Sequence, residues 1–199
     1  IINTKNRNTI VEIIKKEKKE KNHKYYLHIA IAPTKNIDRF EWFLEKSTEI
    51  GIDEITPIIC SRSERKIVKT DRSKRILCSA IKQSLKYYLP KINETITLKK
   101  FLKKEFDGNK YIAHCEDLKR EDLTKIKRKS KTLILIGPEG DFSQAEIELA
   151  LQNKFTSVSL GTSRLRTETA GVIAFLASPA AGYIRGVSVP VDGGRMRSI

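Results

Sequence analysis

Short runs of apolar residues alternate along the chain with longer segments in which apolar residues recur every three or four positions. The short runs predict β-strands, and the longer segments predict amphipathic helices. Strands alternating with helices in this way predict an α/β domain. We expect strands at residues 8–14, 25–32, 55–60, 111–115, 132–136 and 157–160. We expect helices at residues 38–50, 71–89, 97–106, 143–151 and 167–177.

The ends of several predicted helices carry residues that start or stop helices. Asp38 and Ser143 each have a glutamate three residues on, Glu41 and Glu146, which is the pattern of a capping box. Pro90 is expected to stop the second helix, because proline lacks a backbone N–H and clashes with the preceding turn. The unbroken apolar run at 132–136 is typical of a central strand in a parallel sheet.

The chain is expected to divide into three parts. The strands at 8–14 and 25–32 flank a very basic stretch that resembles an exposed hairpin loop, and two strands alone are only marginally stable. We therefore expect residues 1–34 to be the remnant of a small β domain, with the α/β domain at 35–176 and an atypical tail at 177–199. The sequence opens with Ile1 and Ile2 rather than Met, and we expect it to begin inside a longer reading frame.

The positive charge is concentrated in the first two thirds of the chain. Lys and Arg number 39 against 24 Asp and Glu, a net charge of +15. Residues 1–130 hold +14 of this, and residues 131–199 only +1. Such an asymmetry favours a polyanion-binding region beside a catalytic or core-forming one. The alternative is a generally lysine-rich composition that serves solubility.

Cysteine and histidine show no metal-site or disulfide pattern. Cys60, Cys78 and Cys115 are odd in number and form no CxxC motif, and the three histidines lack ligand spacing. No apolar run approaches the ~20 residues of a membrane span. These observations predict a reduced, cytoplasmic, metal-free protein with no membrane partner.

Two loops in the last third are the candidate ligand-binding elements. Residues 137–143 (GPEGDFS) follow a predicted strand and precede a capped helix, and residues 160–170 (LGTSRLRTETA) make the same transition. The strand-end loops of a parallel sheet meet at one edge, where open α/β folds bind ligands. Arg164 and Arg166 add positive charge there. Alternatively, they are surface arginines at a helix start, where the helix dipole disfavours them.

These two motifs resemble those of the RsmE family, the 16S ribosomal RNA uridine-N3 methyltransferases of the SPOUT class. Further segments support the resemblance, namely residues 45–51 (EKSTEIG), 55–57 (ITP), 63–65 (SER) and 83–84 (QS). It covers about residues 8–174. Several ordered motifs at the family's spacing are far more specific than a single glycine pattern.

The resemblance implies a SPOUT-type α/β domain with a C-terminal trefoil knot, preceded by a partial PUA-like β-barrel. It also implies a homodimer that acts on ribosomal RNA of the small subunit. S-adenosylmethionine would be held by the two knot loops. The corresponding residues here are Ile136, Gly137, Pro138, Glu139, Gly140, Leu160, Gly161, Leu165, Arg166 and Thr167.

The chemistry that the resemblance implies needs little beyond positioning and charge. Methylation at N3 requires loss of the uridine N3 proton, and an enzyme has to stabilise the resulting anion. Arg166 is the candidate for contacting the uracil anion or a phosphate. Glu168 would orient Arg166 or take the proton; alternatively it complements the helix dipole as a first-turn acid. His114, at a strand end, either belongs to the core or reaches the site.

The C-terminal segment departs from the family. Residues 175–194 resemble the closing segment of short-chain dehydrogenases, yet Gly51 is the first glycine of the chain, so the dinucleotide-binding loop of those enzymes has no counterpart. Tyr87 and Lys91 have the spacing of the dehydrogenase pair, but Pro90 interrupts them. We therefore expect a methyltransferase with a foreign tail. The alternatives are a non-catalytic RNA-binding remnant and a SPOUT methyltransferase that acts on another RNA.

Overall fold

The computed structural model describes residues 3–5, 8–10, 12–17, 25–116, 120–123, 131–161, 163–177 and 181. Within these residues, eight strands form one sheet with the order β5-β4-β3-β9-β7-β10-β8, and β6 pairs with β4. Every pairing in this sheet is parallel. The strands are β3 (Tyr26–Ile31), β4 (Glu54–Ile59), β5 (Lys91–Ile92), β6 (Ile96–Thr97), β7 (Asn109–Ala113), β8 (Glu121–Asp122), β9 (Lys131–Ile136) and β10 (Thr156–Ser159).

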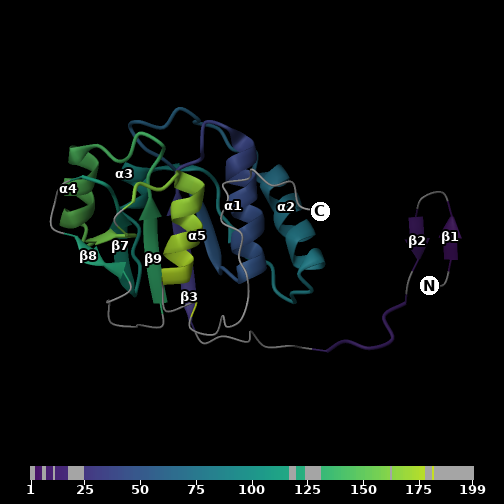
Figure 1. Ribbon diagram of the computed structural model, residues 1–199. Coiled ribbons are helices and arrows are strands. Elements are labelled where there is room, and N and C mark those ends of the chain that lie inside the picture. The colour runs from purple at the N-terminus through teal and green to yellow at the C-terminus, as the bar shows by residue number, and fades with distance from the viewer. Residues whose placement is uncertain are drawn as a thin grey trace.

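Helices cover both faces of the sheet, which gives three layers (Figure 1). Side chains of α1, α2 and α5 form one core cluster with one face of the sheet, and those of α3 and α4 form a second cluster with the other. The helices are α1 (Ile37–Ile50), α2 (Thr70–Gln83), α3 (Leu98–Phe101), α4 (Gln144–Gln152) and α5 (Thr167–Ala177). The α/β class predicted from the sequence is confirmed.

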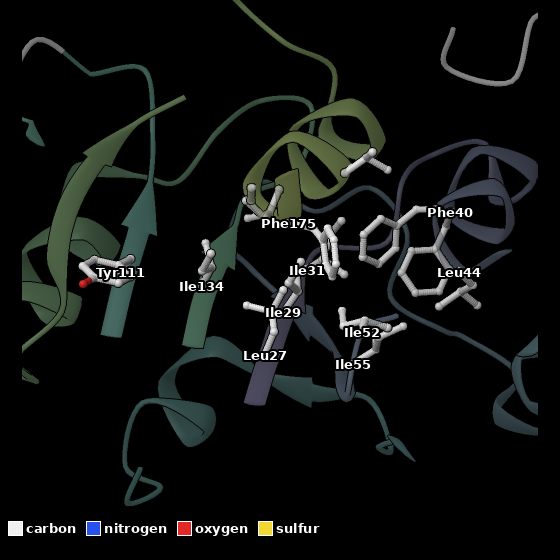
Figure 2. Packing of buried hydrophobic residues seen from close by; sticks show 14 of the residues in the cluster. Leu27, Ile29, Ile31, Phe40, Leu44, Ile52, Ile55, Tyr111, Ile134 and Phe175 are labelled. Carbon is white, nitrogen blue, oxygen red and sulfur yellow. The ribbon is translucent and has the colours of Figure 1, made fainter. Parts of the chain in front are cut away.

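Alternate residues of the central strands enter opposite clusters. Leu27, Ile29 and Ile31 of β3 pack under α1 and α5, whereas Ala30 packs on the α3 and α4 side. Figure 2 shows Phe175 of α5 close to this row of isoleucines. Strands buried on both faces read as continuous apolar runs, which is why the central strands lack a polar alternation in the sequence.

Helix α5 packs closely on the rest of the first cluster at Gly171. A Cβ atom added there would lie 2.6 Å from Cε2 of Phe43 in α1 and 3.0 Å from Cδ1 of Ile31 in β3. These distances are shorter than any normal carbon contact. Glycine at this position therefore lets α5 lie directly against α1 and β3, and so fixes the loop that precedes α5.

The predicted pairing of the first two strands is wrong. The strand at 25–32 forms as expected, but it lies between β4 and β9 in the parallel sheet. β2 (Asn8–Ile10) pairs instead with β1 (Asn3–Lys5), antiparallel. The physical reason is that residues 27–31 of β3 are buried on both faces, and such a strand needs cover on both. Residues 26–31 thus belong to the α/β sheet, although the sequence places them in the remnant at 1–34.

Three predicted helix boundaries are also corrected. The side chain of Asn36, not Asp38, caps α1, since its Oδ1 accepts the Asp38 N–H at 3.0 Å. α2 ends at Gln83 rather than at Pro90, and Leu85 then takes a left-handed φ of 52°. α3 stops at Phe101, because residues 103–105 offer no apolar side chain that would extend its buried face.

The remaining helix ends agree with the sequence. Ser143 and Glu146 form the predicted capping box of α4, and α5 covers the predicted residues Thr167–Ala177. Of the tail beyond α5, Ala181 is described and packs against the first core cluster. The strand-like run at 186–191 and the rest of the dehydrogenase-like segment lie outside the described residues.

Candidate active site

The loops that follow β7, β9 and β10 meet at the carboxyl edge of the sheet and enclose a cavity. Its space amounts to about 580 Å³, part of which is open to solvent. The first turn of α5 closes one side. The lining residues are Ala113, His114, Cys115, Arg120, Ile136, Gly137, Pro138, Glu139, Asp141, Ser159, Leu160, Gly161, Ser163, Arg164, Leu165, Thr167 and Ala170.

Most of the residues predicted to bind the cofactor line this one cavity. Gly140 and Arg166 are the exceptions among the ten. The carbonyl oxygen of Gly140 accepts a hydrogen bond from Nη1 of Arg62 at 2.9 Å. The carbonyl of Arg166 accepts the Ala170 N–H at 2.7 Å, and the Arg166 side chain is exposed. The structure therefore brings the two predicted loops together, and of their predicted cofactor residues only Gly140 and Arg166 do not line the cavity.

Asp141 fixes the loop that follows β9. Its backbone lies in the left-handed region, with φ of 64°, and its N–H donates to the carbonyl of Pro138 at 2.9 Å. Its carboxylate accepts the N–H of Phe142 at 2.8 Å and the N–H of Cys115 at 2.7 Å. A Cβ atom at Gly137 would lie 3.1 Å from the Phe142 ring, so little room is left for movement there.

Glu139 and Arg65 form hydrogen bonds to the backbone of the loop that follows β3. Oε1 of Glu139 accepts the Lys35 N–H at 2.9 Å. The guanidinium of Arg65, from the predicted SER motif, donates to the carbonyls of Thr34 and Lys35 at 3.0 and 2.7 Å. Loops after β3, β4 and β9 are thereby joined into one rigid rim, which preorganises the cavity.

His114 occupies the cavity wall at the end of β7. Its Nε2 lies 2.9 Å from Oγ of Ser157, and its Nδ1 is buried without a hydrogen-bond partner among the described residues. Burial lowers the pKa of His114, so the ring is neutral near pH 7. The Nη1 of Arg120 donates to the His114 carbonyl at 2.7 Å, which couples a second cavity residue to this strand end.

Glu168 lies in the first turn of α5, and its side chain does not line the cavity. Its side chain is fully buried, and its Oε1 lies 3.9 Å from Nε of Arg39 in α1. No hydrogen bond to either carboxylate oxygen occurs in the part of the chain that is described. Its burial and its contact with Arg39 favour a role for Glu168 in the packing of α5 over direct contact with substrate.

Sequence reasoning missed Arg120, Asp141, Ser159 and Ser163 as lining residues. Asp141 lies inside the GPEGDFS motif, and Ser163 lies inside the second motif, so closer attention to these motifs would have found both. Arg120 carries no local signal. It lines the cavity while its Nη1 donates to the carbonyl of His114, a contact that only the folded chain creates.

A cavity between strand-end loops of a parallel α/β sheet is where open α/β folds bind their ligands. The chain matches the model of the RNA methyltransferase domain family over residues 20–178. It is 32% identical over 177 residues to the Ribosomal RNA small subunit methyltransferase E of Mesomycoplasma hyopneumoniae (strain 232), covering 86% of this chain and 76% of the relative. The chain therefore belongs to the ribosomal RNA small subunit methyltransferase E family.

Two crystal structures support the same assignment. One is described as a probable rRNA-methyltransferase from Porphyromonas gingivalis, with 44% identity, a TM-score of 0.75, and coverage of 79% of this chain and 68% of that one. The other is a ribosomal RNA small subunit methyltransferase E from Neisseria gonorrhoeae bound to S-adenosylmethionine, with 29% identity, a TM-score of 0.68, and coverage of 76% and 65%. The family resemblance seen in the sequence is confirmed.

The described residues contain no helix that is long and apolar enough to cross a membrane. They also contain no group of three or more His, Cys, Asp or Glu side chains that could hold a metal ion.

Proposed function

We propose that this protein transfers a methyl group from S-adenosylmethionine to N3 of a uridine in 16S ribosomal RNA. Membership of the ribosomal RNA small subunit methyltransferase E family supports the reaction class and the RNA. The observation that carries the proposal is the strand-end cavity, since eight of the ten predicted cofactor residues line it. The related structure from Neisseria gonorrhoeae is bound to S-adenosylmethionine.

The residues around the cavity fit this cofactor. Much of the lining is apolar, from Ala113, Ile136, Leu160, Leu165 and Ala170, and suits an uncharged purine ring. Gly161 has a φ of 123° and open space where a Cβ would be, so its backbone can be approached closely. When bound, S-adenosylmethionine supplies an electrophilic methyl group on a sulfonium ion.

The chain's own contribution is to bind, orient and stabilise charge. Arg120 and Arg164 line the cavity and give its wall positive charge. Arg166 stays the candidate for contacting the uracil anion or a phosphate from just outside the wall. The resemblance implies that Glu168 orients Arg166 or takes the proton; its contact with Arg39 supports instead a role in positioning the first turn of α5.

We also propose the finer architecture that the family implies. The loops after β9 and β10 would form the C-terminal trefoil knot, and the insertion of β9 between β3 and β7 is compatible with such threading. The residues before β3 would be what is present of a PUA-like barrel, with the α/β domain running from about residue 25 to 177. The active form would be a cytoplasmic homodimer.

The test has two independent readouts. Isothermal titration with S-adenosylmethionine should give saturable heat, and purified small ribosomal subunits from cells that lack the gene should gain one methyl group on a uridine N3, located by mass spectrometry. RNA binding without cofactor heat would support the non-catalytic remnant. A methyl group found only in another RNA would support the third alternative.

A further inference from the structure

A second hollow lies beside the cofactor cavity. Seven of its nine lining residues also line the cavity, so the two spaces are continuous. It is the wider of the two, with about 1070 Å³ of space including open solvent. We call it the arginine groove. Its lining residues are Arg62, Cys115, Glu116, Arg120, Asp141, Ser159, Gly161, Ser163 and Arg164.

Three arginines from three different loops converge on the arginine groove. Arg62 follows β4, Arg120 follows β7, and Arg164 follows β10. The acidic residues in its wall are Glu116 and Asp141, and both oxygens of the Asp141 carboxylate already accept backbone N–H groups. The groove thus presents fixed positive charge next to the place where the methyl group would be delivered.

Two of these arginines are held in place by backbone carbonyls. Nη1 of Arg62 donates to Gly140 at 2.9 Å and to Phe142 at 3.2 Å, and Nη1 of Arg120 donates to His114 at 2.7 Å. These bonds engage one nitrogen of each guanidinium, which carries five N–H donors in all. Arg164 is exposed. Preoriented guanidinium groups with donors to spare suit the bidentate recognition of phosphate.

We propose that the arginine groove receives the phosphate backbone of the RNA strand on either side of the acceptor uridine, with Arg62, Arg120 and Arg164 contacting its phosphates. This inference rests on the proposed function, because it takes the cavity to be the cofactor site. A single small anion, such as the carboxylate of the cofactor, would be matched by one arginine. Three arginines spread along an open groove fit a polyanion better.

The test compares RNA affinity with cofactor affinity. Arg164→Gln, whose side chain is exposed, should weaken binding of a small-subunit rRNA fragment by about tenfold. It should reduce the slope of log affinity against log salt by about 0.7 if the lost phosphate contact is to single-stranded RNA. The dissociation constant for S-adenosylmethionine should change by less than the RNA affinity, although Arg164 also lines the cofactor cavity. Arg75→Gln, an exposed arginine on α2, removes the same charge and should leave all three quantities unchanged.

Arg120 gives a second variant in the groove. Arg120→Lys keeps the charge but loses the planar fork, so it should weaken RNA binding while thermal melting reports whether the His114 strand end is intact. If RNA affinity and salt slope are unchanged in both variants, the proposal is wrong. If cofactor affinity falls instead, the arginines hold the cofactor's carboxylate and the proposal is equally wrong. Failure of the unaltered protein to bind S-adenosylmethionine would overturn the proposed function, and the salt slopes would still test the groove.

Discussion

The carboxylate of Asp141 accepts the backbone N–H of Cys115 at 2.7 Å and thereby joins the loop after β9 to the loop after β7. The same side chain also accepts the N–H of Phe142, so one residue organises two walls of the strand-end cavity. Both hydrogen bonds are assisted by the carboxylate's charge, which makes them stronger than neutral ones.

Asp141→Asn should therefore weaken cofactor binding. Asparagine tolerates the left-handed backbone at this position, but it has one acceptor oxygen in place of two and no charge. We expect the dissociation constant for S-adenosylmethionine to rise about tenfold and the free energy of unfolding to fall by about 1–2 kcal/mol. Titration calorimetry and urea denaturation measure the two. Asp107→Asn, at an almost fully exposed side chain, is the matched control and should change neither.

Gly171→Ala should destabilise the fold by overpacking. The new Cβ would meet Phe43 at 2.6 Å and Ile31 at 3.0 Å, so α5 has to move away from α1 and β3. A cost of about 1–3 kcal/mol is expected, seen as a fall in melting temperature. Gly140→Ala provides the comparison, because its Cβ would meet Arg62 no closer than 3.4 Å. Equal melting temperatures for the two variants would contradict the close packing of α5.

The Arg39 and Glu168 pair should show coupling in a double-mutant cycle. Arg39→Met leaves the buried Glu168 carboxylate without its nearest cation and should cost about 3 kcal/mol. Replacing both residues, with Glu168→Gln as the second change, should cost less than the sum of the two single changes, because the uncompensated charge is gone. Additive losses in the free energy of unfolding would show that the pair does not interact.

Stability should fall as the pH is lowered from neutrality, with His28 as one cause. Burial lowers the pKa of His28 from 6.5 to about 4, with Lys91 and Lys104 acting in the same direction and Glu54 opposing them. The unfolded chain therefore binds a proton in a range where the folded chain does not. This contribution to stability is complete above the unfolded value of 6.5 and is lost as the pH falls toward 4.

The measurement is the free energy of unfolding at a series of pH values. Between pH 6.5 and pH 4.5 we expect His28 to account for a loss of about 2 kcal/mol. His28→Gln, which can still bond Oγ of Thr56, should flatten the slope in this window. Part of the slope should remain, since burial also lowers the pKa of His114. Below pH 4.5 the carboxyl of Glu54 adds a further loss: burial alone would raise its pKa, but hydrogen bonds from Asn93, Tyr26 and Lys91 and the charge of His28 hold it at about 2. A slope that is identical in the variant would contradict the role of His28.

Arg166→Ala should lower turnover with little change in stability. The side chain is exposed at the start of α5, and we expect at least about a tenfold drop in kcat if it contacts the uracil anion or a phosphate. Single-turnover methylation of rRNA and a melting curve are the two measurements. Arg75→Ala, also an exposed arginine, should behave like the unaltered protein. A parallel loss of melting temperature and activity would assign Arg166 a structural role instead.

The sequence by itself determined the class of the fold and the two loops of the site. Apolar runs and helical periodicity are local properties, so most strands and helices could be predicted from them, as could the capping box of Ser143 and Glu146. Each of the motifs GPEGDFS and LGTSRLRTETA is an unbroken stretch of sequence, and residues of both line one cavity. Strand-end loops of a parallel sheet lie at one edge, so the sequence could place both motifs there. Their proximity depends on the strand order, in which only β7 separates β9 from β10.

Only the tertiary structure decided which strands pair and which side chains complete the site. The run at 26–31 is mostly apolar, and that pattern cannot say whether its neighbour is residues 8–14 or β9. Arg62 reaches the site from the loop after β4, whereas His114 and Arg120 follow β7. Their hydrogen bonds to backbone carbonyls or to Ser157 carry no sequence signal. Long-range pairing is selected by the burial of whole faces and by backbone hydrogen bonds, which depend on the folded chain as a whole rather than on any local segment.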